Sequence, residues 1–141
     1  MVSLVDLEKK LVKSENLELQ ELDTLVTGVS RYCVLSGEGF ARIQPIENLT
    51  FSDKDRIHLV LSARYLGSKV QELLSKDQSI NAVVSNDELA NYLRMKLKIV
   101  NARVSDLRKE GSVKDVGKAR YVVMQHSIEP LVKKLDKISK K

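Results

Sequence analysis

Cysteine and histidine are nearly missing from this chain of 141 residues, which has one cysteine and two histidines. The single cysteine, Cys33, allows no intramolecular disulfide and indicates a reducing, cytoplasmic setting. It falls in a predicted strand, which favours a small core residue over the alternative of a redox sensor. The two histidines, His58 and His126, lie in different predicted elements, and the chain has neither an H-x-x-x-H nor a C-x-x-C pair. The sequence therefore predicts no metal site.

The short motifs of common enzyme classes are missing too. The chain has no G-x-S-x-G, no Walker loop and no pair of carboxylates that stands out as catalytic. Gly37 and Gly39 form a Gly-x-Gly, but the third glycine and the following helix of a dinucleotide-binding fingerprint are absent. His58 is as consistent with a packed or exposed side chain as with a functional one. The sequence predicts a protein that is not an enzyme and uses no cofactor.

Long apolar runs are also absent. No run of eighteen apolar residues is present, so no transmembrane helix and no membrane partner are expected. The first ten residues lack the basic region and cleavage site of a signal peptide. A hydrophobic content of 43% argues against wholesale disorder. At this length we expect one ordinary core, with additional helices around it.

The most informative segment that is present covers residues 85–124. Ser85 and Glu88 have the spacing of a capping box, in which the serine accepts the N–H of Glu88 and the glutamate reaches back to the serine N–H. Leu89, Ala90 and Leu93 then share one apolar face. This pattern predicts a short helix that ends near Arg94.

A second helix and a hairpin are predicted to follow. Val100, Val104 and Leu107 fall at i, i+4 and i+7 and should pack inward, with Leu97 or Ile99 helping at the start. Gly111 supplies the left-handed residue expected just after a helix C-terminus. We then expect a strand from Val113, a turn at 115–118 and a returning strand at 119–124; this hairpin, residues 113–124, is called the wing. The residues expected to point outward from the helix are Lys98, Asn101, Ala102, Ser105 and Arg108.

The run L-A-N-Y-L-R-M-K-L-K-I-V-N-A-R-V-S-D-L-R-K-E-G-S-V resembles the helix-turn-helix core of winged-helix transcription regulators, without a gap. The phrase V-N-A-R-V-S-D-L-R-K-E-G and the earlier L-T-F-S-D-K-D are similar to small archaeal members. The resemblance covers about forty residues. It implies a mainly α fold with a small β component (α+β). In that fold Gly111 ends the recognition helix and Gly117 lies at the wing tip.

Two positions depart from the pattern of that superfamily. Arg94 stands where the turn normally has a glycine, which predicts an arginine at an unfavourable φ. Lys96 stands where the recognition helix usually has a Ser or Thr cap, and a cation near a helix N-terminus is unfavourable for the helix alone. A bound phosphate would relieve that penalty, although a solvated lysine is the plainer interpretation.

The basic residues of the chain concentrate in the same region. Residues 1–84 have 10 Lys and Arg against 12 Asp and Glu, a net charge of −2, whereas residues 85–141 have 14 against 7, a net charge of +7. Within 94–120 there are nine basic residues and three acidic ones. Basic patches on small proteins are often only solvated surface. Here fold pattern and charge coincide, which favours duplex DNA as a partner bound with a strong salt dependence.

The resemblance places the second helix, 97–110, in the major groove. Asn101 is the first candidate for base reading because an amide can pair with adenine in a bidentate way, followed by Lys98 and Ser105. Lys118 and Arg120 on the wing suit the phosphate backbone or the minor groove. The alternative is a winged-helix module that docks protein or RNA in a larger complex. The predicted DNA-binding residues are Lys96, Lys98, Asn101, Ala102, Arg103, Ser105, Arg108, Lys114, Lys118 and Arg120.

A supporting helix is predicted over 50–76. Ser52 and Asp55 form a second cap signal, and apolar residues on two edges predict burial on more than one side. Gly67 in its middle indicates either a close crossing by another helix or a bend. The apolar run 80–84 is a candidate for the first strand of the winged-helix sheet.

The remaining segments predict helices and one hairpin. Residues 2–13 and 17–29 have helical apolar spacing, and 32–35 with 40–43 flank a Ser-Gly-Glu-Gly turn typical of a hairpin. No small-molecule effector is indicated by residues 1–50.

The C-terminal segment has the spacing of a short heptad seam, with a proline at its first turn. It is interpreted either as a dimerisation element or as a helix packed on its own domain; since less than two heptads cannot hold a coiled coil alone, a dimer would need the N-terminal helices as well. The expected organisation is an N-terminal extension at 1–48, a winged helix-turn-helix domain at 49–125 and a C-terminal helix at 126–141. We expect a cytoplasmic, nucleoid-associated homodimer. The residues of the seam are Ile128, Leu131, Leu135 and Ile138.

Overall fold

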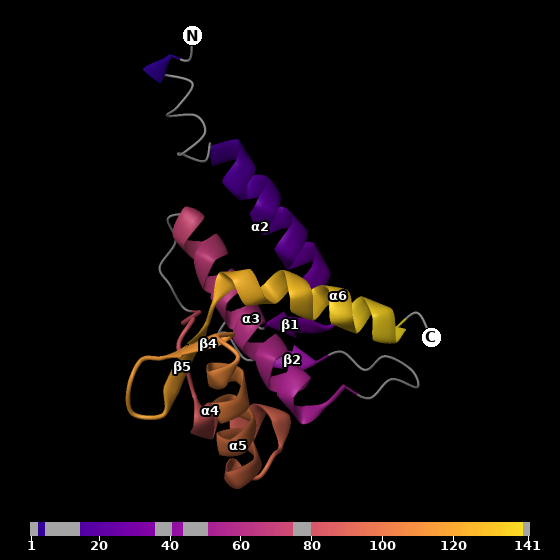
Figure 1. Cartoon of the computed structure of the whole chain (residues 1–141), viewed down its shortest axis with the longest axis vertical. Helices are drawn as coiled ribbons and strands as arrows, with labels where there is room; N and C mark the ends of the chain where they lie inside the picture. Colours follow the sequence, from indigo (N-terminus) through magenta and orange to yellow (C-terminus); the bar gives the residue numbers. More distant parts are fainter. Residues whose placement is uncertain (1–2, 5–14, 36–40, 44–50, 75–79, 140–141) are drawn as a thin grey trace.

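The computed structural model describes residues 3–4, 15–35, 41–43, 51–74 and 80–139. The fold is mainly α with two small antiparallel sheets (Figure 1), as the sequence predicts. The elements are α2 (Glu15–Ser30), β1 (Cys33–Leu35), β2 (Ala41–Ile43), α3 (Asp53–Leu73), β3 (Val84–Ser85), α4 (Asn86–Leu93), α5 (Leu97–Lys109), β4 (Val113–Asp115), β5 (Arg120–Val123), the 3-10 turn η1 (Gln125–Ser127) and α6 (Ile128–Ser139).

Helix α3 is the centre of the molecule. The hydroxyl of Ser52 accepts the N–H of Asp55 at 3.1 Å, so the predicted cap forms and fixes where the helix begins. Ile57, Leu59 and Leu61 have no exposed surface although they point in different directions around the helix. The reason is that α3 contacts α2, α4, α5, α6 and strands of both sheets, which surround it in Figure 1. The predicted burial on more than one side is confirmed.

Gly67 lies where side chains from elsewhere approach α3 closely. A Cβ at this position would lie 2.7 Å from Cδ1 of Leu35 in β1 and 3.2 Å from the side chain of Ile80. The helix continues through Gly67 to Leu73. The residues that approach Gly67 closely therefore belong to a strand and a loop. The crossing by a second helix, which was one of the two predicted alternatives, is wrong.

The larger sheet has the strand order β3-β5-β4, with antiparallel pairing throughout. Its first strand differs from the predicted 80–84, because Val84 is the one residue of that apolar run that pairs with β5, together with Ser85 after it. The wing is formed by β4 and β5, and the returning strand covers Arg120–Val123. β1 and β2 pair antiparallel, as predicted for the N-terminal hairpin, whereas the predicted Ser-Gly-Glu-Gly turn lies outside the described residues. The predicted 17–29 helix is α2, whereas the helix predicted over 2–13 lies mostly outside the described residues.

The C-terminal helix α6 packs against α2 and α3 of its own chain. Ile128 and Leu135 are fully buried and Leu131 is 3% exposed, so the predicted heptad seam faces the core of the same molecule. Of the two interpretations, the dimerisation seam is wrong at these residues, because buried side chains offer no apolar surface to a second copy. The homodimer stays a prediction that requires another surface. The three predicted divisions of the chain also remain predictions, and buried residues from each join one core.

Candidate nucleic-acid interface

The N-terminus of α4 is fixed by Ser85, whose hydroxyl accepts the N–H of Glu88 at 3.1 Å. The carboxylate of Glu88, which was predicted to reach back to the N–H of Ser85, makes other contacts. The carboxylate of Glu88 lies against Arg64 at 3.1 Å and accepts the hydroxyl of Tyr92 at 3.0 Å. Burial and this hydrogen bond to Glu88 raise the pKa of Tyr92 above its ordinary value of 10.0. Glu88 thus ties α4 to α3 through the buried guanidinium of Arg64.

Arg94 ends α4 in the left-handed conformation, with φ of 53° and ψ of 44°. This confirms the prediction that Arg94 adopts an unfavourable, positive φ. The N–H of Arg94 and the N–H of Met95 both reach the carbonyl of Ala90, which closes the turn before α5. A side chain with a Cβ is strained at this φ.

Replacing Arg94 by glycine should remove that strain. We expect Arg94→Gly to be more stable than Arg94→Ala by about 1 kcal/mol, because both variants lose the same charge and only glycine relieves the backbone. Urea denaturation of the two variants and the wild type measures the difference. Equal stability of the two variants would show that the turn carries no strain at this residue.

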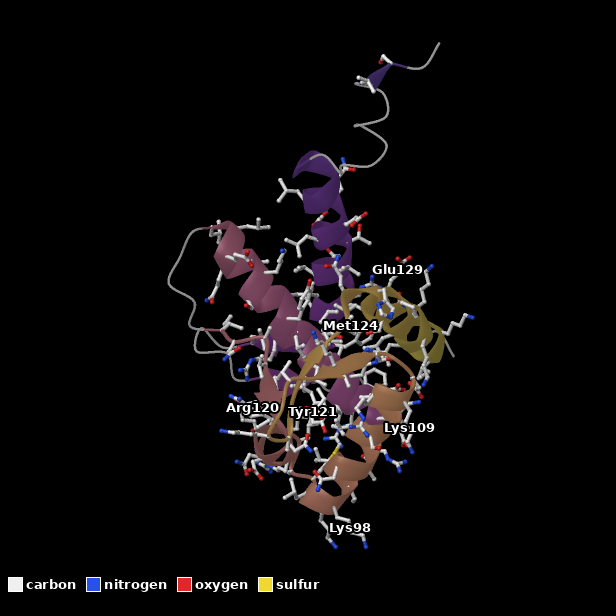
Figure 2. The ribbon with its side chains drawn as sticks, turned by 60° about the vertical axis from the view of Figure 1, so that its left-hand side comes forward. Lys98, Lys109, Arg120, Tyr121, Met124 and Glu129 are labelled. Carbon is white, nitrogen blue, oxygen red and sulfur yellow. The ribbon has the colours of Figure 1, made fainter. Side chains whose placement is uncertain are left out.

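Helix α5 begins after Lys96 without a side-chain cap. Val100, Val104 and Leu107 are at most 1% exposed, as their spacing predicts. The expected help from Leu97 or Ile99 is wrong, because these side chains are 44% and 38% exposed. They belong to the first turn of α5, which projects beyond the core (Figure 2).

The outer face of α5 has the predicted composition. Lys98, Asn101, Ala102, Arg103 and Arg108 are exposed, and Lys96 before the helix is exposed as well. Ser105 is half-buried and lies nearer the protein than predicted. Figure 2 shows Lys98 and Lys109 at the two ends of this helix.

The wing turns through three consecutive left-handed residues, Gly117, Lys118 and Ala119, with φ of 97°, 55° and 56°. The turn therefore extends one residue past the predicted 115–118. The carboxylate of Asp115 accepts the N–H of Gly117 at 2.7 Å, which stabilises the turn. The exposed basic side chains on this hairpin are Lys114, Lys118 and Arg120.

Two of the arginines on α5 are paired with carboxylates. Arg108 lies 3.7 Å from Asp115 of the wing, and Arg103 lies 3.4 Å from Asp106. Both pairs are exposed, so each is worth less than about 1 kcal/mol and can rearrange when another anion binds. Within the part of the chain that the structure describes, five other predicted cations make no ion pair. We call this set the basic face: Lys96, Lys98, Lys114, Lys118 and Arg120.

A hydrogen bond that the sequence did not reveal joins Asn101 to α4. The amide Nδ2 of Asn86 donates to Oδ1 of Asn101 at 2.7 Å, and the backbone N–H of Asn86 donates to the carbonyl of Ala119 at 3.0 Å. Asn86 is the first residue of α4 and is only 6% exposed. One residue thus links the start of α4, the outer face of α5 and the base of the wing. Sequence gives no signal for it, because a polar residue after a helix cap is usually exposed.

A second polar cluster lies behind α5, where α3, η1 and α6 meet around a cavity of about 280 Å³. Nε2 of His58 is 2.9 Å from the hydroxyl of Ser127, and the buried carboxylate of Asp55 pairs with Lys134 at 3.0 Å. Burial lowers the pKa of His58 from 6.5 to about 4, against the opposing attraction of Asp55 and Glu110. Of the possibilities left open by the sequence, His58 is the packed histidine.

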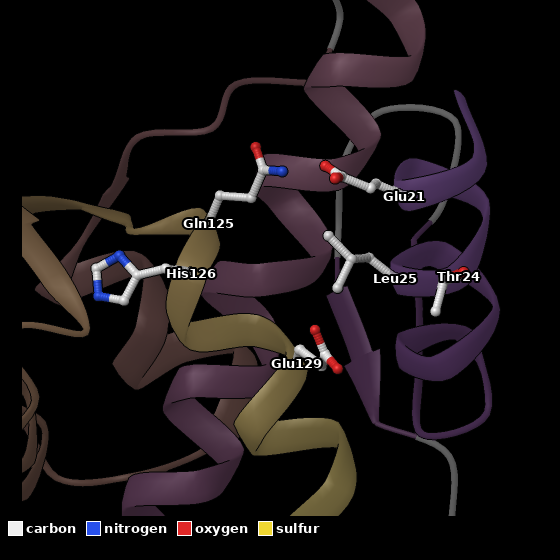
Figure 3. A pocket seen from close by; sticks show the side chains of 6 residues that line it. All are labelled: Glu21, Thr24, Leu25, Gln125, His126 and Glu129. Carbon is white, nitrogen blue, oxygen red and sulfur yellow. The ribbon is translucent and has the colours of Figure 1, made fainter. Parts of the chain in front are cut away.

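A larger cavity, of about 580 Å³, lies between α2 and the start of α6. Figure 3 shows Glu21 and Glu129 on either side of Leu25, with His126 turned away from them. Its carboxylates have the opposite sign to the basic face. No group of three or more potential metal ligands occurs among the residues that the structure describes.

No family model matches this chain, and no curated protein or solved structure matches it either. None of the helices described here is long and apolar enough to cross a membrane.

Proposed function

We propose that this chain is a DNA-binding transcriptional regulator of the winged helix-turn-helix type. One observation supports the proposal above the others. The cap residue before α5, the outer face of α5 and the wing together carry five exposed cations that make no ion pair among the described residues, and the exposed Asn101 lies on α5. Unpaired cations on a helix and an adjoining hairpin match the charge of a phosphate backbone.

The dimensions of α5 suit the proposed docking. An α-helix with its side chains is about 10–12 Å wide, and the major groove of B-DNA is about 12 Å wide. Lys98 and Asn101 would reach base edges from the exposed face, and the methyl group of Ala102 is suited to contact a thymine methyl. Lys114, Lys118 and Arg120 would contact phosphates or the minor groove from the wing. Lys96, at the uncapped start of α5, adds to the positive end of the helix dipole and so favours a phosphate there.

A salt series with random-sequence duplex tests the proposal. If each residue of the basic face contacts one phosphate, the logarithm of the binding constant should fall with the logarithm of salt concentration with a slope of about −4.5. Lys118→Ala should weaken all duplexes alike and reduce that slope by about 0.9. A mobility shift at several salt concentrations measures both.

The control variant is Lys133→Ala, which removes the same charge from α6. Lys133 is exposed and pairs with Glu129 on the same helix at 3.0 Å. It should leave the slope unchanged. Equal effects of Lys118→Ala and Lys133→Ala would mean that net charge alone drives binding, and absence of duplex binding at low salt would overturn the proposal.

The alternative is a surface that docks protein or RNA. Leu97, Ile99 and Val116 are 38–44% exposed on α5 and the wing, which favours an apolar contact. Leu97 and Ile99 alternate with Lys96 and Lys98 along the chain, and Val116 lies on the same wing as Lys114 and Lys118, so a partner that covers them must also accommodate the basic face. If duplex does not bind, single-stranded RNA binding and protein capture by this surface become the next measurements.

A further inference from the structure

The side chain of Asn101 is hydrogen-bonded to the buried side chain of Asn86. Its Oδ1 accepts a hydrogen bond of 2.7 Å from Nδ2 of Asn86, so the carbonyl end of the amide is directed toward α4. Asn101 itself is exposed, whereas Asn86 is 6% exposed. The contact therefore joins a fixed residue to one on the surface proposed to meet DNA.

The orientation of these two amides follows from the buried polar atoms that each possible orientation would leave without a hydrogen bond. In the structure one buried acceptor, Oδ1 of Asn86, has no partner, and it is the single such side-chain atom within the described residues. Exchanging the amide groups would put the two N–H donors of Asn86 at the position of that oxygen. Buried donors without partners are rarer than acceptors without partners, and each costs about 1–3 kcal/mol. The observed orientation is therefore the less costly one.

We propose that Asn86 is a positioning residue that makes Asn101 a hydrogen-bond donor toward DNA. With its carbonyl engaged by Asn86, Asn101 directs its two N–H groups outward. This inference rests on the proposed function and deepens it, because it fixes which base edges Asn101 can read.

The donor orientation selects among the four bases. In the major groove guanine offers N7 and O6 as acceptors, adenine offers N7 and thymine offers O4, whereas cytosine offers only its N4 amino donor. Asn101 is therefore expected to reject cytosine at the position it contacts. The bidentate pairing with adenine expected from the sequence is replaced, because that pairing needs the carbonyl of Asn101 free to accept from the adenine amino group.

The connection of Asn86 to the wing gives this residue its fixed position. Its backbone N–H donates to the carbonyl of Ala119 at 3.0 Å, and Ser85, the residue before it, caps the start of its helix. Neither contact involves the side-chain amide of Asn86. A side-chain substitution therefore removes the hold on Asn101 and leaves the backbone link to the wing in place.

The test is a selection of binding sites from randomised duplex with the full chain. We expect the wild type to disfavour cytosine at one position by roughly fivefold or more, and Asn101→Ala to lose that preference. Asn86→Ala frees the amide of Asn101 to rotate and should broaden the preference at the same position only. Asn86→Asp can accept but cannot donate, so Asn101 should turn its carbonyl outward and prefer adenine or cytosine, which carry amino donors.

The outcomes separate this inference from the proposed function. If the wild type and Asn101→Ala differ at one position but both Asn86 variants keep the wild-type preference, Asn86 does not position Asn101 and the inference fails while DNA binding stands. A wild-type preference for cytosine at that position also overturns it, as does duplex binding with no position that depends on Asn101. These last two outcomes do not require the Asn86 variants to fold. Absence of any duplex binding by the wild type overturns the proposed function instead.

Discussion

Replacing Leu135 by alanine is expected to lower the free energy of unfolding by about 2–5 kcal/mol. Leu135 has no exposed surface and lies on α6, which packs against α2 and α3. The substitution removes buried methyl groups and leaves a cavity that the rigid neighbours cannot fill completely. Urea denaturation measures the loss. Leu19→Ala, at a side chain that is 47% exposed on α2, is the matched control and should change stability by less than about 0.5 kcal/mol.

Protein concentration distinguishes the two interpretations of the C-terminal helix. Since Leu135 is buried within one chain, the loss should be the same at every protein concentration. A dimer held together by α6 would instead unfold at a midpoint that rises with concentration, and Leu135→Ala would abolish that rise. This second result would contradict the packing of α6 on its own core.

Stability is expected to fall as the solution is acidified from pH 6.5 to pH 4, because His58 is buried without charge. The pKa of His58 is lowered from 6.5 to about 4 in the folded chain, so the unfolded chain binds the proton first. The stability that depends on neutral His58 is fully present above pH 6.5 and is lost as the pH falls toward 4. The loss is about 3 kcal/mol over this interval.

The charged neighbours of His58 also shift its pKa. The carboxylates of Asp55 and Glu110 raise its pKa, and the ammonium groups of Lys54 and Lys134 lower it, but burial has the largest effect. His58→Gln keeps a polar side chain near Ser127 and has no group that titrates in this range. Chemical denaturation at pH 4.5, 5.5 and 6.5 should therefore give a smaller slope for His58→Gln than for the wild type.

His126→Gln is the control for the pH measurement, because His126 is exposed. It should keep the wild-type slope. An identical slope for His58→Gln and the wild type would contradict the inference that His58 is neutral and buried in the folded chain.

Local signals account for the elements that sequence analysis placed well. Ser52 and Ser85 mark helix starts because each hydroxyl satisfies an N–H three residues later, within the same short segment. The inner face of α5 was predicted from a spacing of four and three residues, and Val100, Val104 and Leu107 are buried accordingly. Arg94 was predicted at an unfavourable φ because the winged-helix resemblance puts a glycine at this position of the turn, and its φ is 53°.

Predictions that depended on partners far away in the sequence were wrong or incomplete. Leu97 or Ile99 was expected to help the core, yet among the described residues both side chains stay exposed on the first turn of α5. The seam of α6 has heptad spacing, and the same spacing serves a helix that lies on its own α2 and α3. Gly67 indicated either a close crossing by another helix or a bend, and it gave no indication that the side chains of Leu35 and Ile80 approach it.

The sequence by itself determined the order of the helices and the wing, the caps that begin them and the concentration of basic residues after position 84, because each depends on neighbours a few residues apart. Only the tertiary structure decided that Asn86 holds Asn101, that His58 is buried beside Ser127 and that α6 covers the core. The first two contacts join residues 15 and 69 positions apart, and the hydrogen bond from Arg31 to Asp136 of α6 joins residues 105 positions apart. Spacing along one helix or strand contains no information about such partners.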